Sequence, residues 1–129
     1  AEYRAFLGTL ADRGRWDGGF AERAAVSVMC HLQQRLDLGE EKEVRAALPP
    51  KMGELATSCS VHRGLPGERI GRDELLGRVA SDLGIDANRA ESVVRTVFAA
   101  LREWVGETDA EELDELLPHD LLPLWRLPS

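Results

Sequence analysis

The residues best suited to chemistry are two cysteines and three histidines. Cys30-His31 and Cys59-x-x-His62 together offer four side chains of the type that binds zinc. Neighbouring residues on a helix point about 100° apart, however, which is a poor geometry for holding one ion. We therefore expect no metal and no cofactor, with Cys30 as a small buried residue and His31 at the surface.

A nucleophilic site is not indicated either. The potential nucleophiles Ser58, Cys59 and Ser60 stand near His62, but they lack a third group that would orient the base. Acidic residues are numerous, but in a chain with 30% charged residues they are typical of a solvated surface. We expect no catalytic residues and no enzyme activity.

The elements that carry these residues come in two similar halves. Residues 2–57 align without a gap with residues 71–126, and 12 of the 56 aligned pairs are identical. Roughly five identities would arise by chance at this composition. A Leu-Pro pair occurs at the same place in both halves, as Leu48-Pro49 and Leu117-Pro118. We interpret the pattern as an internal duplication.

The apolar spacing predicts helices in both halves. In the second half, a stripe of apolar residues from Leu75 to Leu83 predicts a helix that Gly84 ends. Asp86 is the expected N-cap of a long helix that reaches Val105 and ends at Gly106. A capping box over residues 108–111 then predicts a third helix, and Pro118 is expected to begin a fourth.

The first half follows the same plan with smaller residues. Its long helix is expected over residues 21–36, followed by a helix through Val44, Ala47 and Leu48 and a turn-rich segment from Pro49. No stretch alternates with the period of a strand, so no sheet is expected.

The predicted fold is therefore all-α, a pseudo-two-fold helical bundle of two homologous units with about four helices each. The units are expected over residues 1–57 and 71–129, with a linker over 58–70. Each unit is too small to bury much surface alone, so one shared core is expected.

This pattern resembles a known family. Its marks are a Phe-Leu helix start, a long helix rich in Ala, Val and Leu, a Gly-Glu step at Gly39-Glu40, and a short acidic helix that ends in Leu-Pro. The chain thus resembles the bacterial family called domain of unknown function 2267, although Thr108-Asp109 stands where the second half would repeat the step. The resemblance implies helical architecture and a bacterial cytoplasmic source, and it implies no activity and no functional residues.

The charge is unevenly distributed. The chain has a net charge of −7, which disfavours general binding to nucleic acid or to anionic membranes. Residues 1–69 hold ten basic and ten acidic residues, whereas residues 70–129 hold six and thirteen. No apolar run is long enough for a membrane span.

Two features are candidate contacts for a protein partner. Trp125, whose counterpart in the first half is Ala56, either fills a gap between the halves or serves as an exposed anchor. Glu111, Glu112 and Glu115 belong to an acidic segment that either docks a basic partner or is solvated surface.

The leading functional hypothesis is a non-catalytic protein–protein interaction or scaffold domain, with a protein partner or self-association. One alternative is association with nucleic acid through arginines of the first half such as Arg4, Arg13, Arg15, Arg23 and Arg35. Another alternative is a small-ligand binder with its pocket between the repeats.

Overall fold

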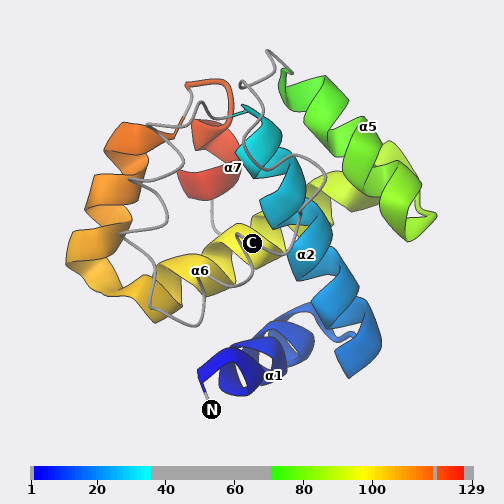
Figure 1. Cartoon of the computed structure of the whole chain (residues 1–129), viewed down its shortest axis with the longest axis horizontal. Helices are drawn as coiled ribbons and strands as arrows, with labels where there is room; N and C mark the ends of the chain where they lie inside the picture. Colours follow the sequence, from blue (N-terminus) through cyan, green and yellow to red (C-terminus); the bar gives the residue numbers. More distant parts are fainter. Residues whose placement is uncertain (1, 36–70, 118, 127–129) are drawn as a thin grey trace.

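A computed structural model describes residues 2–35, 71–117 and 119–126 of the 129-residue chain. These residues form five α-helices and contain no strand, so the predicted all-α class is confirmed for the described part of the chain (Figure 1). The helices are α1 (Glu2–Gly14), α2 (Gly18–Arg35), α5 (Arg72–Leu83), α6 (Ala87–Leu116) and α7 (Leu122–Arg126). Within the described ranges, no helix combines the length and apolar character needed to cross a membrane.

The turn between α5 and α6 forms as its sequence predicts. Gly84 follows α5 in the left-handed conformation, with φ of 68°, which glycine adopts without steric cost. The carboxylate of Asp86 accepts a hydrogen bond of 2.7 Å from the backbone N–H of Arg89, as an N-cap does. Both the predicted stop and the predicted cap are confirmed.

The turn between α1 and α2 has the same construction. Asp17 accepts a 2.7 Å hydrogen bond from the backbone N–H of Phe20, and it stands 69 positions before Asp86. Arg15, which stands 69 positions before Gly84, is also left-handed, with φ of 56°. The two turns thus share a register, and one of them places an arginine where the other has glycine.

Helix α6 differs from the prediction, because it runs through Gly106 without a break. The predicted helix end at Gly106 and the capping box over 108–111 are therefore wrong. An interior glycine costs a helix only about 1 kcal/mol relative to alanine, which good helix formers nearby, such as Glu107, Ala110 and Glu111, can outweigh. The helix still changes direction, since its yellow and orange parts meet at a bend in Figure 1. Glycine is a common site of helix bending.

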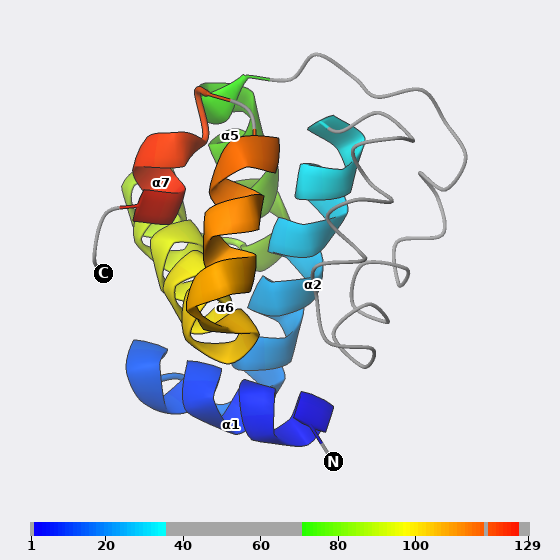
Figure 2. The ribbon, with the colours of Figure 1, turned by 90° about the vertical axis from the view of Figure 1, so that its left-hand side faces the viewer.

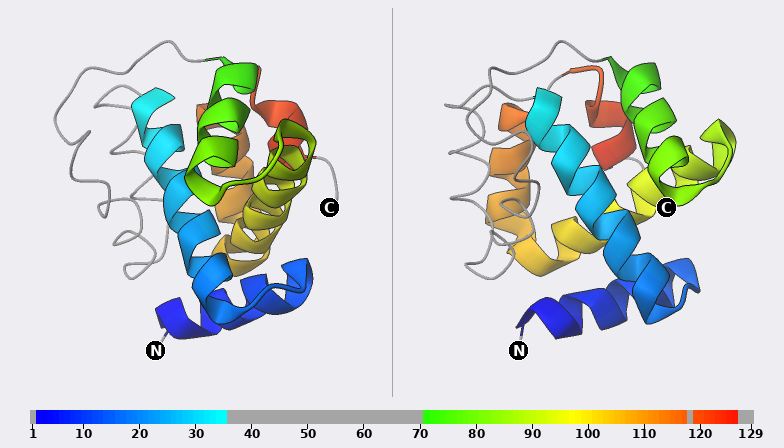
Figure 3. Two further views of the ribbon diagram at one scale, coloured as in Figure 1. Left: turned by 90° about the vertical axis from the view of Figure 1, so that its right-hand side faces the viewer. Right: turned by 45° about the vertical axis from the view of Figure 1, so that its right-hand side comes forward.

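The helices pack in two crossed pairs around one core. The first helix of each half contacts the long helix of the other half, so that α5 packs on α2 and α1 packs on α6. Figure 3 shows α2 beside α5, and Figure 2 shows α1 lying crosswise beneath α2 and α6. The two-unit arrangement about a pseudo-two-fold axis stays a prediction. The helices expected after residue 36 and the linker over 58–70 lie outside the described residues.

Trp125 belongs to this core. It is 2% exposed, and its ring meets that of Phe98 edge-on, with ring centroids 5.6 Å apart. The guanidinium of Arg102 lies over the Trp125 ring, 5.6 Å from its centre. The burial does not agree with an exposed anchor, whereas the filling of a gap between the halves stays a prediction, because these contacts are with α6 of the same half.

Candidate functional site

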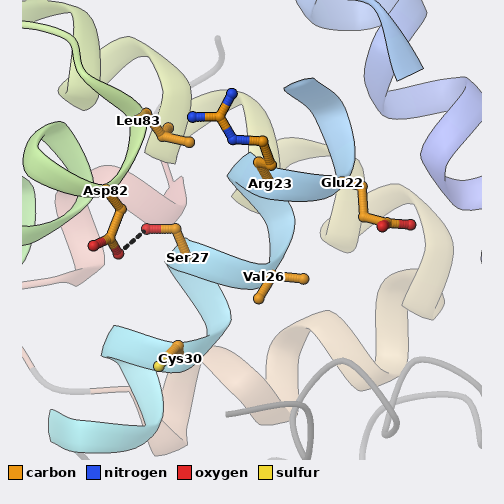
Figure 4. A pocket seen from close by; sticks show the side chains of 7 residues that line it. All are labelled: Glu22, Arg23, Val26, Ser27, Cys30, Asp82 and Leu83. Atoms are coloured by element: carbon orange, nitrogen blue, oxygen red, sulfur yellow. Dashed lines mark hydrogen bonds between the residues drawn. The ribbon is translucent and has the colours of Figure 1, made fainter. Parts of the chain in front are cut away.

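A cluster of three polar side chains joins α2 to α5, and we call it the Asp82 clasp. The hydroxyl of Ser27 donates to Oδ2 of Asp82 at 2.8 Å, and Nε2 of His31 lies 2.7 Å from the same oxygen. Figure 4 shows Asp82 reaching across from α5 to Ser27. His31 is 8% exposed, so its predicted surface position is wrong. It is buried because α5 packs over this face of α2, which the sequence of α2 alone does not reveal.

The clasp is arranged for holding helices together rather than for nucleophilic attack. In a catalytic triad the histidine accepts the proton of the serine hydroxyl, and the carboxylate orients the histidine. Here the Ser27 hydroxyl donates to the carboxylate itself. One oxygen of Asp82 therefore satisfies two buried groups of α2, which stabilises the contact between the helices.

A pocket of about 310 Å³ lies beside the clasp. Its lining residues come from α2 and the end of α5, and they are Glu22, Arg23, Val26, Ser27, Cys30, Asp82 and Leu83. In Figure 4, Arg23 extends toward Leu83 of α5, whereas Glu22 points away from Asp82. The mixture of charged, polar and apolar groups favours no single class of ligand.

The structure describes two of the four candidate zinc ligands, Cys30 and His31. Cys30 is only half-buried and is disulfide-bonded, which corrects its expected role as a small buried residue. Residues 58–62, which contain the other candidate ligands and nucleophiles, lie outside the described residues. Among the described side chains, no group of three or more His, Cys, Asp or Glu could hold a metal ion.

A second site lies where the turn between α1 and α2 faces the first turns of α6, and we call it the Trp16 pocket. It consists of two hollows of about 410 and 220 Å³, which adjoin because Trp16 and Arg89 line both. The other lining residues are Arg13, Gly14, Ser92, Val93 and Thr96 in the larger hollow and Arg15, Asp17 and Phe20 in the smaller.

The ring of Trp16 is held firmly in this pocket. A Cβ atom at position 14 would stand 2.4 Å from the nearest ring atom, so the ring can lie against the backbone only because residue 14 is glycine. The ring of Phe20 contacts it edge-on, with centroids 5.1 Å apart. Trp16 remains partly exposed, so it offers a fixed apolar surface beside polar groups.

Three arginines surround this aromatic surface. Arg13 forms an ion pair of 2.6 Å with Glu103 of α6. Arg15 and Arg89 are both exposed, and within the described part of the chain neither guanidinium has a carboxylate partner. The Trp16 pocket therefore carries two positive charges available for a ligand.

The described arginines of the nucleic-acid alternative do not all line one pocket. Arg13 and Arg15 reach the Trp16 pocket, whereas Arg23 lines the pocket beside the clasp. Arg4 is exposed on α1, and the side chain of Arg35 is outside the described set. Arg89, which completes the Trp16 pocket, was not identified from the sequence, because only the packing of α6 against α1 brings it there.

The predicted acidic residues lie near the end of α6. Glu111 and Glu115 are exposed one helical turn apart, and the side chain of Glu112 is outside the described set. Asp114 is less exposed and lies 3.9 Å from Arg102. The structure does not bring these acids to Trp125 as a joint exposed surface, because Trp125 is buried.

Comparison with known proteins identifies a family. The model of the family described as "Uncharacterized conserved protein (DUF2267)" matches residues 3–124, which is most of the chain. No curated protein matches the chain.

Proposed function

The chain belongs to the DUF2267 family, and we propose that it acts as a non-catalytic protein-interaction domain whose contact surface is the acidic end of α6. Glu111 and Glu115 lie on this surface, and both are exposed. The proposed partner is a protein with a basic surface, because such a surface complements the carboxylates.

The observation that carries this proposal is the uninterrupted course of α6. Six acidic residues fall between positions 107 and 115. At the beginning of a helix such residues would be stabilised by the helix dipole, but α6 begins at Ala87 and ends at Leu116. None of these acids lies in the first turn, and Asp114 and Glu115 lie in the last turn, at the negative end of the dipole, which contains no basic residue. Helix stability gives no reason for these acids, which favours a role in binding.

The construction of the Asp82 clasp supports a non-catalytic role. Its serine and histidine both bond to the same carboxylate oxygen, so the hydroxyl of Ser27 is engaged as a donor. A nucleophile activated by a base would need the opposite arrangement, with the proton directed at the base.

The test compares two double variants. Glu111→Gln with Glu115→Gln removes two charges from the proposed surface, and Asp73→Asn with Glu74→Gln removes two from the first turn of α5. Each protein serves as bait in an extract of its native organism, at low and high salt. We expect a basic protein bound by wild type at low salt to be lost with the first variant and retained with the second, because screening weakens exposed charge pairs.

Thermal unfolding provides a second readout. The Glu111/Glu115 variant should be as stable as wild type or more stable by about 0.3–1 kcal/mol, mainly from position 115. If both variants retain the same partners at every salt concentration, the acidic end of α6 is solvated surface only. A shift of duplex DNA at physiological salt by the wild-type protein would instead favour the nucleic-acid alternative.

A further inference from the structure

We propose that the Trp16 pocket binds a small organic anion, with its carboxylate or phosphate between Arg15 and Arg89 and its flat apolar body against Trp16. This inference concerns a different surface from the acidic end of α6 and does not depend on the proposed protein partner. It identifies the class of ligand by charge and shape.

The first argument is electrostatic. The chain has 23 acidic and 16 basic residues, so acidic partners for arginine are plentiful. Arg13 has one in Glu103, but within the described structure Arg15 and Arg89 have none. The guanidinium group presents N–H donors in a planar fork that matches a carboxylate or phosphate. Two such groups at the edge of one pocket form a site for an anion.

The acidic groups at the pocket offset only part of the charge of its three arginines. Asp17 also lines the smaller hollow, but its carboxylate accepts a 2.7 Å hydrogen bond from the backbone N–H of Phe20. It therefore acts as the N-cap of α2. Glu103 is paired with Arg13 at 2.6 Å. The remaining charge at the pocket is positive.

The second argument is the backbone of Arg15. Its φ of 56° lies in the left-handed region, where a Cβ atom is sterically disfavoured. The same position of the other turn is Gly84, with φ of 68°, which is the residue suited to that conformation. Unfavourable backbone conformations are concentrated at functional sites, where the side chain has a use that compensates for them. The arginine at this position is explained by a contact of its guanidinium with a ligand.

The third argument comes from comparing the two interhelical contacts. Between α2 and α5, Asp82 reaches across and bonds to Ser27. Between α6 and α1, the position equivalent to Asp82 is Arg13, which instead pairs with Glu103. The equivalent of Ser27 is Thr96, whose hydroxyl donates to the backbone oxygen of Ser92 in its own helix, at 2.8 Å. Both contacts have a pocket beside them, but the second has an arginine in its lining at the position where the first has a carboxylate.

The size of the pocket and its fixed aromatic ring set the kind of ligand. The larger hollow, of about 410 Å³, falls within the range of small-molecule sites. Trp16 is held by Gly14 and Phe20, so its exposed surface does not have to be ordered on binding. A ligand with a flat apolar part can lie on this surface while its charge meets the arginines.

The experiment titrates the whole chain with defined probes by isothermal calorimetry. Adenosine monophosphate and benzoate represent the phosphate and carboxylate sources, adenosine and benzamide are their uncharged counterparts, and inorganic phosphate tests the charge alone. We expect one of the two anions to bind at least about tenfold more tightly than its neutral counterpart, and to weaken as salt increases. The anion that binds identifies the source.

Single variants locate the site. Arg15→Gln and Arg89→Gln should each weaken binding about tenfold or more, since each removes one charged hydrogen-bonding group. Arg4→Gln, on the exposed part of α1 outside the pocket, should leave it unchanged. Circular dichroism verifies that each variant is folded.

Three results would overturn the proposal. If neither organic anion binds more tightly than its neutral counterpart, both the phosphate and the carboxylate are excluded as the ligand's charged group. Inorganic phosphate binding as tightly as adenosine monophosphate would indicate an adventitious ion only. An equal loss in Arg4→Gln and Arg15→Gln would indicate attraction to the protein surface in general rather than to the Trp16 pocket.

Discussion

Replacing Arg15 with glycine tests whether the turn between α1 and α2 is strained. At φ of 56° a residue with a Cβ atom is less stable than glycine by about 1–2 kcal/mol. Glycine also gives the unfolded chain more conformational freedom, which offsets about 0.5–1 kcal/mol of that gain. Arg15 is exposed and has no ion pair within the described structure, so few contacts are lost. Arg15→Gly should therefore stabilise the protein by roughly 0.5–1 kcal/mol.

The expected change is large enough to measure. Unfolding entropy is about 2.1 cal/mol/K per residue, which for 129 residues gives about 0.27 kcal/mol/K. Arg15→Gly should therefore raise the Tm by about 2–4 °C. Thermal unfolding followed by circular dichroism, together with the midpoint of urea unfolding, measures the change.

The repeat provides a control with the opposite sign. A Cβ atom at Gly84 would meet no other atom within 4 Å, so Gly84→Ala changes only the backbone preference at φ of 68°. It should lower the Tm by a few degrees. If Arg15→Gly lowers the Tm while Gly84→Ala behaves as expected, the left-handed conformation of Arg15 is not strained, and the backbone argument for a functional role of its side chain is refuted.

Two further substitutions test the core and the clasp. Asp82→Ala leaves Ser27 and His31 without their shared acceptor and should cost about 1–3 kcal/mol in chemical denaturation, whereas a cost near zero would show that solvent replaces the carboxylate fully. Trp125→Ala removes a ring that is 2% exposed and should cost about 3–5 kcal/mol, so an unchanged Tm would contradict its place in the core.

Local signals in the sequence are sufficient for much of this fold. Gly84 and Asp86 predict a helix end and a helix start, and both depend on the backbone of the turn itself. The apolar stripe of α5 is likewise a local pattern, and its members are buried as the spacing predicts, namely Leu75, Leu76, Val79, Ala80 and Leu83. Features set by four or five neighbouring residues could be derived without the rest of the chain.

One error is local: Gly106 and the Thr108 capping pattern are adequate signals for a break, but the backbone of α6 continues through both. The other errors occur where tertiary contacts decide. His31 has no apolar character that would predict burial, and it is buried because Asp82 of another helix provides a partner. Arg89 was missed for the same reason, since its relation to Trp16 exists only after α6 meets the turn of α1 and α2.

The two interhelical contacts show how one duplicated pattern can serve two purposes. Asp82 and Arg13 occupy equivalent positions, yet their charges are opposite. Asp82 bonds to Ser27 of the long helix α2, whereas Arg13 pairs with Glu103 of the long helix α6 and not with the equivalent of Ser27. The carboxylate of Asp82 joins α5 to α2, because the buried hydroxyl of Ser27 needs a hydrogen-bond partner. Arginine cannot accept a hydrogen bond, so Thr96 turns to its own helix instead. One side of the molecule is thereby stabilised by the clasp, and the other keeps the polar hollow in which we place the anion.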